Sequence, residues 1–210
     1  MSSAPQIKGS NNFREIFDYT SDAGTICDAV CGICGAYQPE NAALAAEVAL
    51  QMGVVPETIA KGLSLATNPA RFEVLENDPI VIYDGAHNKN GMAALCKSLK
   101  HYFPHWTGAT FIMAFMGDKD YESAFAELKC ANLDKGSEVF AVKVLDNPRA
   151  AEPKTLAAKL GELGFSATAF DSLDEAYRLA KAKGKPVIVC GSLYLYKDLY
   201  YVRNKENTHQ

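Results

Sequence analysis

The stretch that decides the fold is residues 79–95, PIVIYDGAHNKNGMAAL. Its apolar run Ile80–Tyr83 has the length of a short buried strand, and DGAHN has the composition of a tight turn. Met92 and Leu95, continued by Leu99 and Phe103, recur at helical spacing. A buried strand, a turn and an amphipathic helix form the first half of a βαβ unit.

The same alternation continues toward the end of the chain. Three further apolar segments read as strands: ATFIMAFM at 109–116, SEVFAVKVL at 137–145 and KPVIVC at 185–190. Helical spacings separate them, and Ser172 with Glu175 forms a capping-box pattern before the last strand. Continuous apolar strands alternating with helices predict a mostly parallel sheet covered on both faces, a doubly wound α/β domain from about residue 70 to 200. The polar tail RNKENTHQ is expected to fray.

The residues before this domain have a different pattern. Residues 12–37 predict extended structure with a hairpin turn at Ser21–Gly24. The segment PENAALAAEVALQMG then predicts a helix that ends at Gly53, and a second helix begins after Pro56. These elements do not complete a core, so they indicate the tail end of a larger domain.

Composition excludes several classes. The chain has 210 residues, 48% hydrophobic and 22% charged, as in ordinary globular domains. A net charge of -4 argues against a nucleic-acid partner. The start, MSSAPQIKGS, lacks the apolar centre of a secretory signal, and no apolar run approaches the roughly 20 residues of a membrane span. A cytoplasmic protein without a membrane partner is expected.

The cysteine group Cys27, Cys31 and Cys34 allows two interpretations. It could be a redox pair or a metal knuckle, or it could be three small apolar residues on a strand. GAYQPE separates CGIC from the next helix, and no second pair supplies a fourth ligand. The strand interpretation is therefore preferred, and no metal ligand is assigned.

Ligands of open parallel sheets bind outside the carboxyl ends of the strands. Polar turn segments follow all four predicted strands: residues 84–88, 117–120, 146–149 and 191–192. Turns are polar in any protein, and for the second and third segments that explanation is at least as good as a functional one.

The first of these segments carries the most chemistry. The Asp84 carboxylate can accept hydrogen bonds from a ribose, and His87 and Asn88 can orient a polar substrate or a phosphoryl group. Simple capping of the following helix is the alternative for Asp84 and Asn88.

The longer string RFEVLENDPIVIYDGAHNKNGMAAL, at 71–95, resembles the signature of the folylpolyglutamate and dihydrofolate synthases, members of the Mur ligase superfamily. Ala70 stands where that family usually has glycine. GAYQPENA at 35–42 resembles a second family segment, with Tyr37 in place of histidine. MGDKD at 116–120 and GSLYL at 191–195 resemble two more. The four motifs occur in the family's order and correspond to its C-terminal part.

The resemblance implies a fold and a set of roles. Residues 1–67 would be the remnant of a central P-loop ATP-binding domain, and residues 68–210 a Rossmann-like glutamate ligase domain. Asn41, Arg71 and Asp84 match positions that contact ATP, and His87 and Ser192 match positions near the incoming L-glutamate. The family reaction uses ATP and Mg²⁺ to add glutamate to folate through an acyl phosphate.

One family element has no counterpart in this sequence. No G-x-x-x-x-G-K-[ST] string occurs, and the only Gly-Lys pair, Gly184-Lys185, precedes a strand. The magnesium ligands and the folate-binding loop also belong to the family's first half. We therefore expect a chain that is inactive alone. One alternative is a split ligase completed by a separate N-terminal chain, and another is a non-catalytic nucleotide- or glutamate-binding module.

Overall fold

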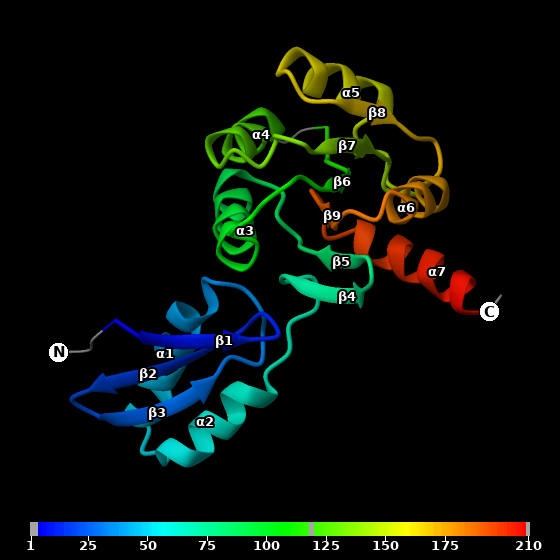
Figure 1. The fold of residues 1–210 in the computed structure, drawn as a ribbon. Helices are drawn as coiled ribbons and strands as arrows, with labels where there is room; N and C mark the ends of the chain where they lie inside the picture. Colours follow the sequence, from blue (N-terminus) through cyan, green and yellow to red (C-terminus); the bar gives the residue numbers. More distant parts are fainter. Residues whose placement is uncertain (1–3, 118–119, 209–210) are drawn as a thin grey trace. The chain divides into compact units, whose positions relative to one another are not determined.

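The computed structural model describes residues 4–117 and 120–208. The chain forms two compact units that divide between Arg71 and Phe72 (Figure 1). Within the described residues, no helix is long and apolar enough to cross a membrane.

The first unit is a three-stranded antiparallel sheet with two helices. The strands are β1 (Gln6–Asn11), β2 (Arg14–Ser21) and β3 (Gly24–Val30), in the order β1-β2-β3, and the helices are α1 (Gln38–Gln51) and α2 (Pro56–Leu65). The predicted hairpin is confirmed, since Ser21 pairs with Gly24 across the turn. Strand β1 was not predicted, because all six of its residues are exposed and it carries no apolar pattern.

The second unit is built on a six-stranded sheet. Its strands are β4 (Glu73–Asn77), β5 (Ile80–Tyr83), β6 (Thr110–Met113), β7 (Glu138–Ala141), β8 (Ala167–Ala169) and β9 (Val187–Cys190). They lie in the order β4-β5-β9-β6-β7-β8, and only the β4–β5 pairing is antiparallel. The predicted mostly parallel α/β fold is confirmed. Strands β4 and β8, which have no continuous apolar run, were missed.

Five helices connect and follow these strands: α3 (Lys89–Tyr102), α4 (Tyr121–Cys130), α5 (Pro153–Glu162), α6 (Leu173–Ala182) and α7 (Leu195–Thr208). Helices α3 and α4 pack together on one face of the sheet, and α6 and α7 pack together on the other (Figure 1). The chain moves along the sheet in one direction from β5 to β8 and then returns to place β9 between β5 and β6. Because parallel crossovers are right-handed, this reversal puts α6 on the opposite face.

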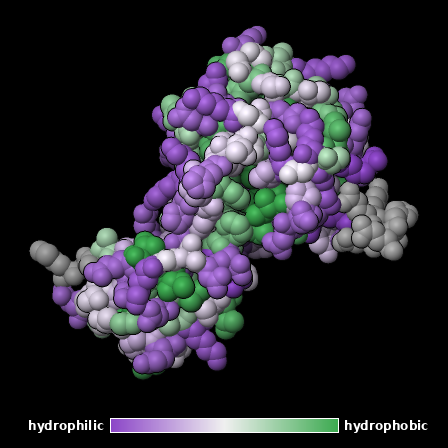
Figure 2. All heavy atoms as spheres, in the orientation of Figure 1, coloured by the Kyte–Doolittle hydropathy of each residue, from purple (hydrophilic) through white to green (hydrophobic). Residues whose placement is uncertain are grey.

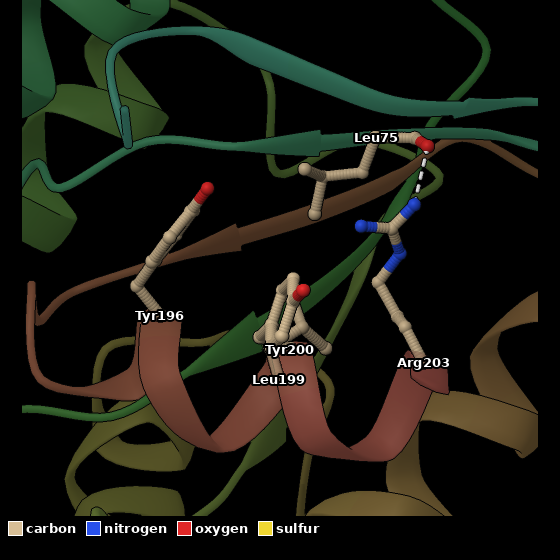
Figure 3. Close-up of a pocket in the computed structure, with 5 residues that line it drawn as sticks. All are labelled: Leu75, Tyr196, Leu199, Tyr200 and Arg203. Carbon is tan, nitrogen blue, oxygen red and sulfur yellow. Dashed lines mark hydrogen bonds between the residues drawn. The ribbon is translucent and has the colours of Figure 1, made fainter. Parts of the chain in front are cut away.

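The end of the chain differs from the prediction. Helix α7 continues to Thr208, so the expectation that RNKENTHQ frays is wrong for the residues up to that point. Arg203 donates from its guanidinium to the carbonyl oxygen of Leu75 at 2.6 Å and lies 3.4 Å from Glu76, which ties α7 to β4 (Figure 3). The pocket at this contact has a volume of about 10 Å³, which is room for one water and not for an organic ligand.

Candidate functional site

The carboxyl edge of the parallel strands collects the polar segments that the sequence singled out. Strands β5, β9, β6 and β7 are neighbours in that order, so the segments that follow them share one edge of the sheet. Asp118 and Lys119 of the second segment lie outside the described residues. The chain leaves β5 through α3 on one face and leaves β9 through α7 on the other. Such a divergence is the topological switch point at which open α/β sheets bind ligands.

Asp84 holds the backbone at the start of this edge. Its side chain is buried, with Oδ1 accepting from the backbone N–H of Ala86 at 2.8 Å and Oδ2 accepting from that of Phe72 at 2.9 Å. The helix-capping alternative is therefore wrong for Asp84. It is confirmed for Asn88, whose Oδ1 accepts from the N–H of Gly91 at 2.9 Å at the start of α3.

His87 is half-buried in the same turn. Its Nδ1 lies 2.7 Å from the carbonyl oxygen of Gly85. Because a carbonyl oxygen can only accept, Nδ1 carries the proton in this contact, and Nε2 of the neutral ring is an acceptor. The imidazole is thus oriented by the turn that Asp84 closes.

Ser192 follows the neighbouring strand and is almost completely buried. Its Oγ accepts from the backbone N–H of Tyr194 at 3.2 Å. The N–H of Gly191 donates to the carbonyl oxygen of Ala86 at 2.8 Å, which joins this turn to the one that carries His87. The structure therefore brings Asp84, His87 and Ser192 together on two hydrogen-bonded turns.

A glycine makes this junction possible. Gly191 has φ +100°, and a Cβ at this position would come within 2.3 Å of the carbonyl oxygen of Ala114 and 2.7 Å of the Phe115 ring. No larger residue fits without moving the backbone.

Sequence reasoning missed Tyr83, which sets the position of Ser192. Its hydroxyl donates to the carbonyl oxygen of Ser192 at 2.5 Å, and its ring packs edge-on against Tyr196 with centroids 5.1 Å apart. Burial raises the pKa of the Tyr83 hydroxyl well above its ordinary value, so the group stays a donor. The available signal was a tyrosine, rather than an aliphatic residue, at the end of the IVIY strand, because a buried tyrosine needs a partner for its hydroxyl.

The polar segments that follow β6 (residues 117–120) and β7 (residues 146–149) have local structural roles in their described parts. Asp120 accepts from the backbone N–H of Ser123 at 3.1 Å and caps α4. Asn147 accepts from the N–H of Arg149 at 3.1 Å within its own turn. The N–H of Gly117 donates to the carbonyl oxygen of Arg149 at 2.7 Å, so the two segments support each other. For Asp120 and Asn147 the turn-forming explanation holds.

Asn41 and Arg71 belong to the first unit. Asn41 lies in the first turn of α1, where its Nδ2 donates to the side-chain oxygen of Gln38 at 3.1 Å. Arg71 is half-buried, and its two neighbours both have left-handed backbone conformations, Ala70 with φ +61° and Phe72 with φ +44°. The conformation of Ala70 explains why glycine suits this position in the resembling family.

Cys31, one of the two thiols of the CGIC segment, lacks the environment of a reactive thiol. Burial raises the pKa of the Cys31 thiol to about 12, the opposite of the shift that makes a thiol reactive. Only Cys27 lies on β3, where it is exposed, while buried Cys31 and half-buried Cys34 follow the strand, so the interpretation as three apolar strand residues is wrong. Among the described residues, no group of three or more His, Cys, Asp or Glu side chains could hold a metal ion.

These features define a class: a Rossmann-like α/β unit whose candidate ligand edge is made by the turns after β5 and β9. The chain belongs to the Mur ligase family, since the family model described as "Mur ligase, glutamate ligase domain" matches residues 70–193.

The relatives of the chain include folylpolyglutamate and dihydrofolate synthases. The chain is 30% identical to the folylpolyglutamate synthase of Lacticaseibacillus casei over 205 residues, which cover 92% of this chain and 44% of that protein. It is 32% identical to the dihydrofolate synthase/folylpolyglutamate synthase of Escherichia coli, over 75% of this chain and 36% of that protein. The chain thus spans less than half the length of these relatives.

Solved structures of folylpolyglutamate synthases are similar to this chain in fold. A Mycobacterium tuberculosis folylpolyglutamate synthase complexed with ADP matches with a TM-score of 0.81 and 25% identity, over 94% of this chain and 46% of that one. E. coli FolC in complex with DHPP and ADP matches with a TM-score of 0.76 and 26% identity, over 95% and 46%. The resemblance inferred from the four motifs is confirmed.

Proposed function

We propose that this chain is the C-terminal portion of an ATP-dependent ligase that adds L-glutamate to the γ-carboxylate of folate. Residues 1–67 would be the end of its central ATP-binding domain, and residues 68–210 its glutamate ligase domain. The observation that carries the proposal is the pair of hydrogen-bonded turns after β5 and β9, in a chain whose relatives are folylpolyglutamate synthases.

On the nucleotide side, Asp84 would accept from the ribose hydroxyls of ATP. Its two oxygens accept the backbone N–H groups of Phe72 and Ala86, and a carboxylate oxygen can accept more than one hydrogen bond. Arg71 would pair with the phosphates, for which a guanidinium offers planar charged donors, and Asn41 would complete the nucleotide contacts. The two solved relatives cited above contain ADP, which supports ATP as the co-substrate.

On the amino-acid side, His87 and Ser192 would orient the incoming glutamate. The Ser192 hydroxyl accepts from Tyr194 and still has its own proton to donate to a carboxylate oxygen. The Nε2 of neutral His87 is an acceptor suited to the glutamate amine or to the proton that this amine releases. The shared hydrogen bonds of the two turns would hold these groups in register.

The reaction proceeds in two steps. A folate carboxylate oxygen attacks the γ-phosphorus of ATP, and ADP leaves to give an acyl phosphate. The glutamate amine then attacks the acyl carbon, phosphate leaves with the bonding electrons, and the amine loses a proton. The Mg²⁺ that this chemistry uses would neutralise phosphate charge, and its ligands are expected in the N-terminal half of the ligase. The residues of this chain would supply positioning rather than bond making.

A partner for the first unit is part of the proposal. Leu44, Val48 and Met52 recur every four residues along and just beyond α1 and are 69%, 54% and 78% exposed. Hydrophobic side chains also reach the surface of this unit in the view of Figure 2. An exposed apolar helix stripe of this kind marks an interaction surface. We propose that it packs against the P-loop half of the ligase, supplied by a separate chain or by a longer form of this one.

The test is an assay of radiolabelled glutamate incorporation into tetrahydrofolate. The chain alone is expected to be inactive. A fusion of this chain to the part of the L. casei synthase that does not align with it is expected to be active. Val48→Lys in α1 should lower the activity of that fusion. Activity of the unaided chain would overturn the incomplete-ligase proposal. A fusion that hydrolyses ATP but ligates no glutamate would overturn the assigned substrate.

A further inference from the structure

The hydroxyl of Tyr83 reaches from the end of β5 to the turn that carries Ser192. Tyr83 is the last residue of β5 and is fully buried. Its hydroxyl donates to the carbonyl oxygen of Ser192 at 2.5 Å, which joins one strand to the turn after its neighbour. An aliphatic residue could also fill this part of the core, but it could not donate to that carbonyl. The tyrosine therefore adds a hydrogen bond to the candidate ligand edge.

The turn after β9 is bonded to the β5 side of the edge at two successive residues. The N–H of Gly191 donates to the carbonyl oxygen of Ala86 at 2.8 Å, and the carbonyl oxygen of Ser192 accepts from Tyr83. The turn is thus a donor in one bond and an acceptor in the other. Two bonds at successive residues fix the orientation of the turn as well as its position. Without the Tyr83 hydroxyl, only the Gly191 bond of this pair remains.

Tyr83 is itself held by α7 and β4. Its ring packs edge-on against Tyr196, with the centroids 5.1 Å apart. Figure 3 shows Tyr196 projecting from the first turn of α7 toward the sheet. The hydroxyl of Tyr196 donates to the carboxylate of Glu73 at 3.0 Å, and Glu73 is the β4 residue that pairs with Tyr83 in the antiparallel ladder. Because these contacts hold the Tyr83 ring, its hydroxyl oxygen stays beside the Ser192 carbonyl.

The side chain of Ser192 depends on the same turn. Its Oγ accepts from the backbone N–H of Tyr194 at 3.2 Å. The carbonyl and the hydroxyl belong to one residue, so a rotation of the turn that breaks the Tyr83 bond would also redirect the hydroxyl. Hydrogen bonds weaken steeply with distance and misalignment, so a small rotation is enough to weaken a contact with a ligand.

We propose that Tyr83 is a positioning residue for the amino-acid substrate and acts through Ser192. It orients the turn after β9 so that the Ser192 hydroxyl meets a carboxylate of the incoming glutamate, while Tyr83 itself contacts no substrate. This inference rests on the proposed ligase function. Because that carboxylate forms no new bond in the reaction, the contact stabilises the bound substrate and the transition state alike. Its loss should therefore raise the KM for glutamate and leave kcat unchanged.

The kinetic test uses the fusion to the L. casei synthase. Tyr83→Phe keeps the ring and removes the hydroxyl, and it should raise the KM for glutamate about fivefold. The values of kcat and of the KM for ATP should stay within about twofold. Ser192→Ala should raise the KM for glutamate about tenfold. The double variant should also show a rise of about tenfold, rather than the roughly fiftyfold rise of two independent sites, because Tyr83 acts through the hydroxyl that Ser192→Ala removes.

Tyr177→Phe is the matched control. Tyr177 is another fully buried tyrosine of the second unit, and its hydroxyl donates from α6 to Glu76 at 2.5 Å. Its substitution should destabilise the fold to a similar degree without changing the KM for glutamate. An unchanged KM for glutamate in Tyr83→Phe would overturn the inference. So would an equal rise in Tyr177→Phe, or an equal rise of the KM for ATP.

A measurement on the chain alone separates this inference from the ligase proposal. The amide protons of Gly191 and Tyr194 should exchange with solvent about tenfold faster in Tyr83→Phe, relative to the amides of β6, and should not do so in Tyr177→Phe. Unchanged exchange would show that Tyr83 does not position the turn, even if the fusion is an active ligase. If exchange accelerates but the fusion with unaltered Tyr83 ligates no glutamate, the proposed function is wrong, and the assignment of glutamate to this turn is wrong with it.

Discussion

The sheet of the first unit is buried on one face, whereas the central strands of the second unit are buried on both. Along β2, buried residues such as Phe17 and Tyr19 alternate with more exposed ones. Along β6 and β9, every residue is buried. Among the residues that the structure describes, the first unit has a core of nine buried side chains and exposes Leu44 and Val48 of α1 to solvent. The second unit therefore buries both faces of its central strands, while the first unit buries one face of its sheet and exposes an apolar stripe on α1.

The substitution with the largest expected effect destabilises the second unit at a close backbone contact. Gly191→Ala should destabilise it by more than about 4 kcal/mol, because the new Cβ meets the carbonyl oxygen of Ala114 at 2.3 Å in a left-handed backbone conformation. Urea unfolding followed by Trp106 fluorescence measures this, since that tryptophan belongs to the second unit. Gly161→Ala, in open space within α5, is the control and should stabilise by about 1 kcal/mol. Equal behaviour of the two variants would contradict the assigned clash.

The next largest effect is expected from a substitution that unfolds the first unit alone. Phe17→Ala removes a fully buried ring from the nine-residue core and should cost about 3–5 kcal/mol, enough to unfold a unit with so small a core. Circular dichroism should lose the signal of the first unit while the Trp106 fluorescence transition stays in place. If the fluorescence transition moved equally, the two units would fold as one, and the contrast between them would be wrong.

A smaller effect separates the structural role of Asp84 from its proposed ligand role. Asp84→Asn keeps the shape but turns one of the two accepting oxygens into a donor that faces a backbone N–H. The cost should be about 2–3 kcal/mol in urea unfolding. Asn88→Ala, which removes the cap of α3 in the same turn, should cost about 1 kcal/mol. If Asp84→Asn left the free energy of unfolding unchanged, the carboxylate would have no structural role, and only its proposed role in ligand binding would remain.

The smallest effect concerns pH at the edge of the second unit. Burial acts to raise the pKa of Glu76, but the bonds from Lys181 at 2.7 Å and from Tyr177 at 2.5 Å outweigh it and lower that pKa below 4.5. A lowered pKa contributes stability that is complete above the ordinary value and is lost as the pH falls through the folded value. Because the group is partly solvated, the loss should be about 0.5 kcal/mol. Glu76→Gln should flatten this part of the stability curve, and an unchanged slope would contradict the assignment.

Much of the fold was readable from the sequence. The continuous apolar runs of β5, β6, β7 and β9 predicted a parallel sheet, and the capping patterns at Asn88 and Ser172 correspond to observed helix starts. Strand β4 was missed because Glu73 and Glu76 interrupt its apolar pattern. Their partners are distant in the chain, since Glu73 accepts from the hydroxyl of Tyr196 and Glu76 pairs with Arg203. Local periodicity contains no information about such partners.

The sequence by itself determined the alternation of strands and helices, the turn residues at the strand ends and the family motifs, because these depend on neighbours along the chain. Only the tertiary structure decided that β9 lies between β5 and β6, and so that Ser192 stands beside the turn of His87. It also decided that Asp84 is bound by two backbone N–H groups, that Tyr83 holds Ser192 and that Trp106 lacks an acceptor among the described residues. These facts depend on groups far apart in sequence, which meet only when the sheet has assembled.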